Sequence, residues 1–180
     1  MIGELSLNGD VCGVRGILPI VDYAKSQGIH KVILPYQNRR EAGVIPDMEI
    51  VAVQDLKQTV EYLLGDLTIP TELPLQQEGH RSLPFAEDFA DVKGQKLLKR
   101  ATEIAVAGMH NILYLGPPGA GKSMIAKRIP TIMPGLSYEE SLELTKIYSV
   151  NGMLDAEEGL VWNRPFRMPH HSITANALIG

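Results

Sequence analysis

The chain has 180 residues, of which 44% are hydrophobic and 21% charged, and its formal net charge is −4. These values are typical of a globular protein with one or two domains, and the acidic balance excludes a broadly basic surface for nucleic acid. The single cysteine, Cys12, excludes a disulfide framework and a cysteine-based zinc site. The first residues lack the basic and apolar regions of a signal peptide, and no apolar run approaches membrane-spanning length. We therefore expect a cytoplasmic protein without membrane contact.

Residues 1–65 are predicted to form a small α/β unit. Apolar runs bounded by turn residues predict strands, and apolar residues at helical spacing predict helices. These elements alternate along the chain, which favours a partly parallel sheet. In chain order we expect a strand at 4–7, a helix at 18–27, strands at 31–34 and 49–53, and a helix from Asp55 to Leu64 with an apolar face of Leu56, Val60, Leu63 and Leu64.

Residues 66–86 contain three prolines, one glycine and no sustained periodicity, which predicts a linker. An ordered arm packed on a domain is the alternative. The second unit follows at 87–180. It is predicted to contain a helix at 96–106, a buried parallel strand at 112–115 and a helix that opens at Met124. A last helix is predicted from the capping box of Ser137 and Glu140 to about Tyr148, with Leu142, Thr145 and Ile147 among its inner positions.

The most informative stretch is the segment 116–123, hereafter the phosphate loop, which fits the pattern G-x-x-x-x-G-K-[ST] without a mismatch. A strand, a glycine-rich loop and a helix N-terminus together form an anion-binding site, because backbone N–H groups point at the phosphate oxygens. The alternative is a Gly-Pro turn before a helix that does not bind a nucleotide. We expect nucleoside triphosphate binding by Gly116, Pro117, Pro118, Gly119, Ala120, Gly121, Lys122, Ser123 and Met124.

Two of these residues have distinct predicted roles. Lys122 is expected to reach the β- and γ-phosphates of ATP as a point charge. The hydroxyl group of Ser123 is expected to ligate Mg²⁺, which prefers oxygen ligands. The predicted cofactors are therefore ATP and Mg²⁺.

The second unit resembles the magnesium-chelatase-like AAA+ ATPases. The strings that carry this resemblance are DFADVKGQ at 88–95, HN at 110–111, the phosphate loop, IMP at 132–134, LS at 136–137 and RPFRMPHH at 164–171. The resemblance implies the N-terminal part of a P-loop α/β domain with a parallel sheet. It also implies that backbone groups of Val92 and Gly94 meet the adenine of the nucleotide.

The first unit resembles the C-terminal part of the Lon-protease-like domain. The strings that carry this resemblance are GELSLNGDV at 3–11, VRGILP at 14–19 and GIHKVILP at 28–35. A Lon-like unit followed by a magnesium-chelatase-like unit is the order of the YifB/ComM family, whose members resemble hexameric motors that act on DNA. The resemblance therefore implies ring assembly and DNA as a partner of the intact protein.

Two departures from these families limit the expected chemistry. Leu18 stands where Lon proteases have the lysine of their catalytic pair, and a leucine cannot activate a nucleophile, so we expect no proteolysis. No apolar run ending in Asp-Glu follows Ser123, although the family uses such a Walker B strand. We expect a partial chain that binds ATP and hydrolyses it poorly, with no catalytic residue of its own. A chelatase-type ATPase subunit and a non-hydrolysing adaptor module remain as alternatives.

The C-terminal segment carries a local cluster of basic and aromatic residues. This composition suits contacts with phosphates and stacking on bases, and packing of the loop on its own domain or a neighbouring subunit is the alternative. A metal site is disfavoured, because adjacent histidine side chains diverge and no third ligand stands at a suitable spacing. The cluster comprises Trp162, Arg164, Phe166, Arg167, His170 and His171.

Overall fold

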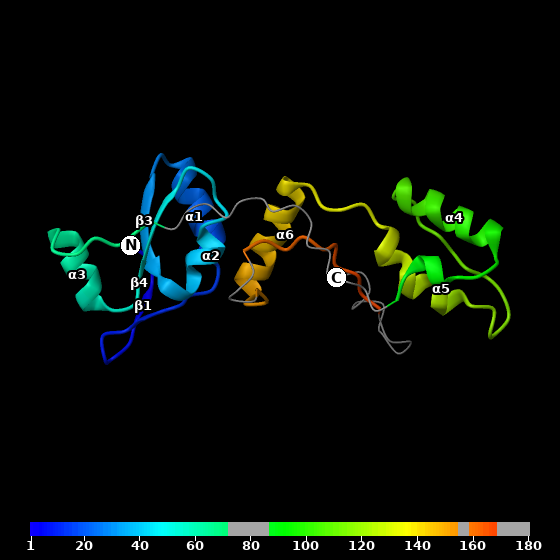
Figure 1. Cartoon of the computed structure of the whole chain (residues 1–180), viewed down its shortest axis with the longest axis horizontal. Coiled ribbons are helices and arrows are strands. Elements are labelled where there is room, and N and C mark those ends of the chain that lie inside the picture. Colours follow the sequence, from blue (N-terminus) through cyan, green and yellow to red (C-terminus); the bar gives the residue numbers. More distant parts are fainter. Residues whose placement is uncertain (72–86, 155–158, 169–180) are drawn as a thin grey trace. The chain divides into compact units, whose positions relative to one another are not determined.

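The computed structural model describes residues 1–71, 87–154 and 159–168 (Figure 1). The chain folds into two compact units, one of Met1–Gly79 with Ser137–Val161 and the other of His80–Leu136 with Trp162–Gly180. Most of the predicted linker and both histidines of the C-terminal cluster lie outside the described residues. Among the described helices, none is long and apolar enough to cross a membrane.

The first unit contains two pairs of strands. Strands β1 (Glu4–Leu5) and β2 (Val11–Cys12) form a short antiparallel hairpin. Strands β3 (Lys31–Pro35) and β4 (Glu49–Val53) are parallel, with Lys31 opposite Glu49 at one end of the register and Pro35 opposite Val53 at the other. The predicted α/β class is confirmed, and the parallel pairing lies between the two strands that the apolar runs predicted.

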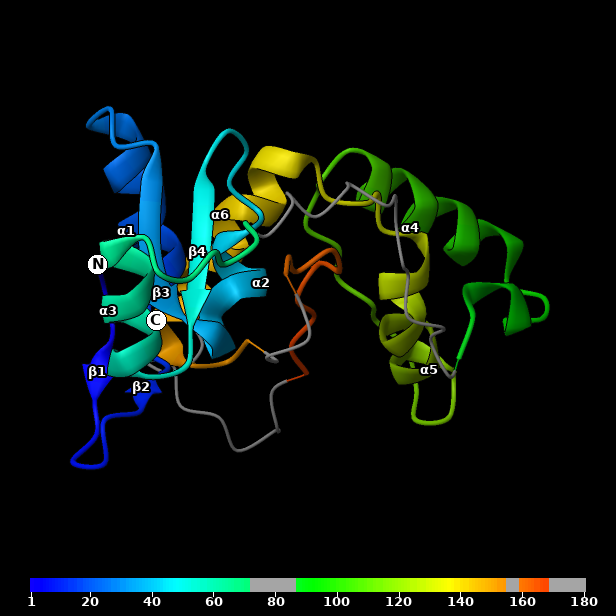
Figure 2. The ribbon, with the colours of Figure 1, turned by 60° about the vertical axis from the view of Figure 1, so that its left-hand side comes forward.

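Side chains of the parallel pair alternate between two cores. Val32, Leu34 and Ile50 face a cluster that contains residues of α1 (Ile17–Ser26) and the loop after α2 (Arg39–Ala42). Ile33, Val51 and Val53 face a second cluster on the other side, against which Tyr62 of α3 (Leu56–Leu64) packs. Burial on both faces explains why these strands are continuous apolar runs. Figure 1 shows α3 and α1 on opposite sides of the two strands, and in the turned view of Figure 2 α3 lies in front of them.

The predicted apolar face of α3 is wrong, although the helix itself is confirmed. The Asp55 side chain caps it by accepting a hydrogen bond from the Gln58 N–H at 2.7 Å. The inward side chains are Thr59, which is 1% exposed, and Tyr62, which is partly buried. These two residues flank the apolar stripe, so the helix is rotated about its axis from the predicted orientation. Between 42% and 71% of the surface is exposed at Leu56, Val60, Leu63 and Leu64.

Helix α6 (Tyr138–Asn151) belongs to the first compact unit, although its sequence lies after the phosphate loop. The predicted capping box is confirmed, since Ser137 and Glu140 each accept a hydrogen bond from the other's backbone N–H. The inner face of the helix consists of small hydroxyl residues, Ser141, Thr145 and Ser149, which are all buried. Of the three predicted inner residues, Thr145 is fully buried and Leu142 packs against the first core cluster, whereas Ile147 is 59% exposed.

The second unit consists of helical elements around a small core. Phe89, Val92 and Ile125 are buried together, with Leu98 and Tyr114 packed against them. The predicted strand at 112–115 is wrong, because no described segment pairs with it and it has no regular secondary structure. The elements are the 3-10 turn η2 (Phe89–Asp91), helix α4 (Lys96–Ala107), helix α5 (Lys122–Arg128) and the 3-10 turn η3 (Ile129–Ile132).

Candidate nucleotide-binding site

The phosphate loop runs from the irregular segment after α4 into helix α5. Its turn is closed by a hydrogen bond from the Ala120 N–H to the Pro117 carbonyl oxygen at 3.3 Å. Gly121 is the N-cap of α5 and has a φ of 80°, a left-handed conformation that favours glycine. The first hydrogen bond of the helix is donated by Ile125 to the Gly121 carbonyl, at 3.0 Å. The backbone N–H groups of the preceding residues therefore have no acceptor within the helix.

The Lys122 side chain folds back over the phosphate loop. Its Nζ donates hydrogen bonds to the carbonyl oxygens of Gly116 and Pro117, both at 2.7 Å. An ammonium group that bonds only to neutral carbonyl oxygens can exchange them for the oxygens of a phosphate, because charged phosphate oxygens are stronger hydrogen-bond acceptors. The role predicted for Lys122 toward a nucleotide phosphate stays a prediction, and the structure places its ammonium group at the phosphate loop.

Ser123 and Met124 occupy the first turn of α5, and both are exposed. A single hydroxyl group is one of the six oxygen ligands that Mg²⁺ requires. The described residues include no cluster of His, Cys, Asp or Glu that could hold a metal ion. Ser123 therefore fits Mg²⁺ only as one ligand of an ion that also coordinates phosphate oxygens and water.

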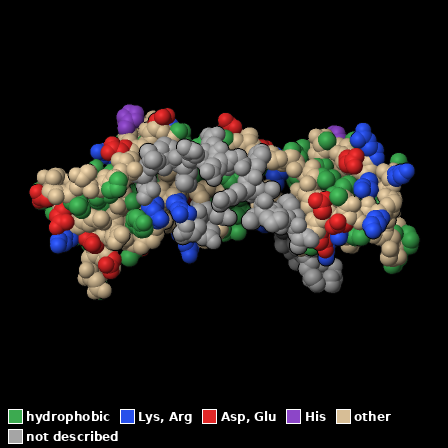
Figure 3. All heavy atoms as spheres, viewed as in Figure 1, with side chains coloured by type: hydrophobic (Ala, Val, Ile, Leu, Met, Phe, Trp, Pro, Cys, Tyr) green, Lys and Arg blue, Asp and Glu red, His purple; other side chains and the backbone are tan. Residues whose placement is uncertain are grey.

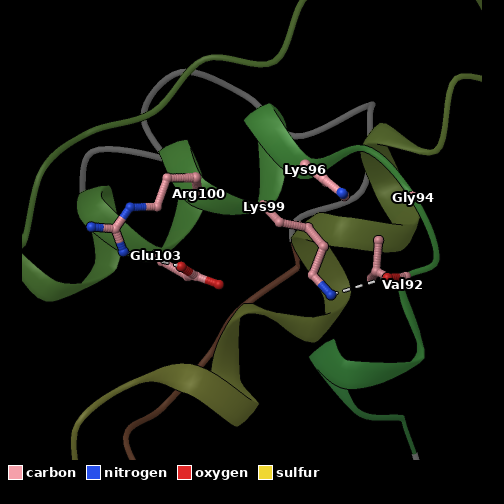
Figure 4. Close-up of a pocket in the computed structure, with 6 residues that line it drawn as sticks. All are labelled: Val92, Gly94, Lys96, Lys99, Arg100 and Glu103. Carbon is pink, nitrogen blue, oxygen red and sulfur yellow. Dashed lines mark hydrogen bonds and ion pairs between the residues drawn. The ribbon is translucent and has the colours of Figure 1, made fainter.

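Val92 is fixed in the core of the second unit. It is 2% exposed, its N–H donates to the Phe89 carbonyl at 3.2 Å, and its own carbonyl accepts a hydrogen bond from Lys99 Nζ at 3.1 Å. Figure 4 shows the Lys99 side chain directed at that carbonyl. The segment after η2 is thus tied to both α4 and the core. Of the two predicted adenine contacts, Gly94 is the more accessible.

A pocket of about 370 Å³ lies beside the start of α4 (Figure 4). Its charged residues lie on one face of the helix, and no residue of the phosphate loop lines it. Arg100 pairs with Glu103 at 3.4 Å, so part of the positive charge is neutralised. Lys and Arg side chains gather over α4 in Figure 3. The lining residues are Val92, Gly94, Lys96, Lys99, Arg100 and Glu103.

Gln95 connects α4 to the phosphate loop and was not among the predicted site residues. Its Nε2 donates a hydrogen bond to the Ala120 carbonyl at 3.1 Å. The only signal in the sequence was its position next to Gly94, at the end of the string that carries the family resemblance.

The arginines of the C-terminal cluster differ in their surroundings. Arg164 is half-buried, and its Nε donates to the Pro134 carbonyl at 2.9 Å. Arg167 and Phe166 are exposed. Arg164 therefore holds the loop against its own unit, which matches the packing alternative, whereas Arg167 presents its charge to solvent.

The fold and the site define an α/β protein in which a glycine-rich loop leads into a helix. The family profile described as magnesium chelatase, subunit ChlI, matches residues 88–180, and that of the Lon protease (S16) C-terminal proteolytic domain matches residues 1–66. The chain belongs to the magnesium-chelatase-like family, in the YifB/ComM group in which a Lon-type unit comes first.

Relatives align with nearly the whole chain. They include an uncharacterised protein of Mycobacterium tuberculosis, 41% identical over 180 residues, competence protein ComM of Haemophilus influenzae, 36% over 183, and YifB of Escherichia coli, 36% over 181. These alignments cover 100%, 99% and 100% of this chain, respectively, and 35% of each relative. The chain therefore spans about a third of the length of these relatives, and the predicted family is confirmed.

Proposed function

We propose that this chain binds ATP with Mg²⁺ at the phosphate loop and forms part of an ATP-driven motor of the YifB/ComM type. The observation that carries the proposal is the Lys122 ammonium, held at 2.7 Å by two carbonyl oxygens of a loop that leads directly into a helix N-terminus. The family supports the use of a nucleotide and Mg²⁺.

Binding is tested by calorimetric titration of the 180-residue chain with ATP·Mg²⁺. Loss of the Lys122 charge in Lys122→Ala is expected to weaken binding by about ten- to a hundredfold, since a hydrogen bond to a charged group contributes roughly 1.5–3 kcal/mol. The matched control is Lys127→Ala, an exposed lysine in the last turn of the same helix. Absence of heat with the unaltered chain at high micromolar concentration would favour the adaptor alternative.

Hydrolysis by the 180-residue chain is expected to be slow, because phosphoryl transfer depends on a positioned carboxylate that the sequence does not supply after an apolar strand. Steady-state turnover that disappears in Lys122→Ala would contradict this expectation. A chelatase-type subunit is the less favoured assignment, because a Lon-type unit precedes the magnesium-chelatase part of this chain.

The proposed partner of the intact motor is DNA, and its proposed assembly is a hexameric ring. Both rest on resemblance to the YifB/ComM family. Arg167, which is exposed, is the better candidate for a DNA contact than Arg164, which bonds to the Pro134 carbonyl. In the full-length protein, Arg167→Ala is expected to weaken DNA binding with unchanged thermal stability. Arg164→Ala is expected to lower thermal stability as well, because it removes a contact that holds the loop.

A further inference from the structure

Gln95 has an unusual backbone for a residue with a side chain. Its φ of 47° and ψ of 42° lie in the left-handed region, which residues other than glycine rarely adopt. It directly precedes α4 and follows Gly94, which is also left-handed with a φ of 73°. The fold therefore maintains a strained conformation at a position where glycine would be free of strain.

The side chain of Gln95 reaches a residue 25 positions later in the sequence. Its Nε2 donates to the Ala120 carbonyl at 3.1 Å, and it lies 3.2 Å from the point where a Cβ on Gly121 would stand. The segment before α4 is also packed on α5, because Val92 is buried against Ile125 of that helix. The carboxamide thus links the start of α4 to the phosphate loop.

The geometry of a peptide group gives this bond a consequence for anion binding. In a planar trans peptide, the C=O and the following N–H point in opposite directions. The Ala120 carbonyl points to Gln95, so the Gly121 N–H points away from it. Peptides next to glycine reverse easily, because glycine accepts both signs of φ. Reversal of this peptide would replace a donor by a carbonyl oxygen on the side where the N–H now points.

We propose that Gln95 is a positioning residue of the phosphate loop, whose carboxamide locks the Ala120–Gly121 peptide so that an N–H, and not a carbonyl oxygen, faces a bound phosphate. The proposal rests on nucleotide binding at residues 116–123 and adds a residue outside the loop to that site. The strained backbone of Gln95 directs the carboxamide at this one peptide.

Two variants of the 180-residue chain test the proposal. Gln95→Glu keeps the shape of the side chain and removes its N–H donor. This variant is expected to bind both ATP·Mg²⁺ and inorganic tripolyphosphate at least tenfold more weakly, because its carboxylate faces a carbonyl oxygen near an anion site. Gln95→Gly relieves the backbone and removes the bond. It is expected to unfold at the same or a higher temperature than the unaltered chain, yet to bind ATP about fivefold more weakly.

The control is Gln27→Glu, which adds the same charge at an exposed glutamine of the first unit and is expected to leave binding within twofold. Binding by Gln95→Glu or by Gln95→Gly within twofold of the unaltered chain would overturn the role of Gln95 and leave the nucleotide site intact. Failure of the unaltered chain to bind either ligand would overturn the nucleotide site itself, and the role of Gln95 with it. If both variants unfolded at a lower temperature than the unaltered chain and also bound ATP more weakly, the role of Gln95 would be purely structural and the proposal would be rejected.

Discussion

The hydroxyl group of Ser149 in α6 donates a hydrogen bond to the carboxylate of Glu41, which lies 108 residues earlier in α2. The same carboxylate accepts hydrogen bonds from the Leu18 N–H at 3.1 Å and from Asn38 Nδ2 at 3.0 Å. Glu41 thus joins the start of α1, the start of α2 and the end of α6. In this way a helix from the magnesium-chelatase part of the sequence becomes a component of the first unit.

Removal of the Glu41 carboxylate is expected to destabilise the first unit. Glu41→Ala leaves the donors of Leu18, Asn38 and Ser149 without this acceptor, and each partly buried donor without a partner adds to the cost. We expect a loss of about 2–3 kcal/mol in the free energy of unfolding, measured by denaturant titration with circular dichroism. Glu61→Ala is the control, because its exposed pair with Lys57 contributes under about 1 kcal/mol. Equal effects of the two substitutions would show that Glu41 is not an anchor.

Alkaline pH is expected to weaken the attachment of α6. The hydrogen bond to Asp22 raises the pKa of Lys146, and burial raises the pKa of Tyr138, whose hydroxyl donates to the Val44 carbonyl. Both groups favour the folded state in their protonated form, so their contribution is complete below the unfolded pKa values of 10.5 and 10.0. It is lost as the pH rises from about 10 through the higher folded values.

This loss is measured as the change in unfolding temperature between pH 9 and pH 12. Lys31 beside Glu49 also has a raised pKa, so part of the change belongs to the strand pair. The double variant Lys146→Gln/Tyr138→Phe is expected to be less stable than the unaltered chain at pH 8, and its unfolding temperature is expected to fall less between pH 9 and pH 12. An unchanged slope in that variant would assign the alkaline transition to other groups.

Truncation of a buried residue of the sheet is expected to cost far more stability than truncation of an exposed leucine of α3. Ile50 is fully buried in the first core cluster, so Ile50→Ala is expected to cost about 2–5 kcal/mol of unfolding free energy. Leu64 is 71% exposed, and Leu64→Ala is expected to change stability by under about 0.5 kcal/mol. A loss above about 2 kcal/mol for Leu64→Ala would support the apolar face that the sequence pattern predicted for α3.

The elements that sequence patterns predicted well are those with strong local signals. Strand β4 coincides with its apolar run, and Asp55 and Ser137 cap the helices that they were predicted to cap. The orientation of α3 was predicted poorly for a physical reason. Its inner face contains Thr59, whose hydroxyl group bonds to the Asp55 backbone carbonyl in the preceding turn and so lies buried at little cost. A hydrophobic pattern cannot identify such positions.

The phosphate loop was located by its spacing alone, but its contacts were not. The bonds from Lys122 to the carbonyls of Gly116 and Pro117 are local, and a motif that fixes the spacing of these residues also fixes their proximity. The bond from Gln95 to Ala120 joins residues on separate elements, which tertiary contacts such as the packing of Val92 on Ile125 bring together. That contact depends on tertiary structure, which a local motif does not contain.

Two glycines of the phosphate loop provide a matched pair for the last prediction. Gly119 and Gly121 have φ values of 79° and 80°, so alanine at either position introduces similar backbone strain, about 1–2 kcal/mol. A Cβ at Gly119 meets no atom within 4 Å, whereas a Cβ at Gly121 lies 3.2 Å from Gln95 Nε2. Gly121→Ala therefore displaces the carboxamide in addition to straining the loop. We expect it to weaken ATP binding more than Gly119→Ala does.

A double-mutant cycle separates the two effects. In a Gln95→Ala background the carboxamide is absent, so Gly121→Ala is expected to cost less affinity than in the unaltered chain, with a coupling of at least about 0.5 kcal/mol. Gly119→Ala has no contact with Gln95 and is expected to be additive with Gln95→Ala within about 0.3 kcal/mol. Titration calorimetry with ATP·Mg²⁺ supplies all the affinities. Additivity in both cycles would mean that backbone strain alone explains the loss of affinity in Gly119→Ala and Gly121→Ala. A displaced carboxamide would instead couple residue 121 to residue 95.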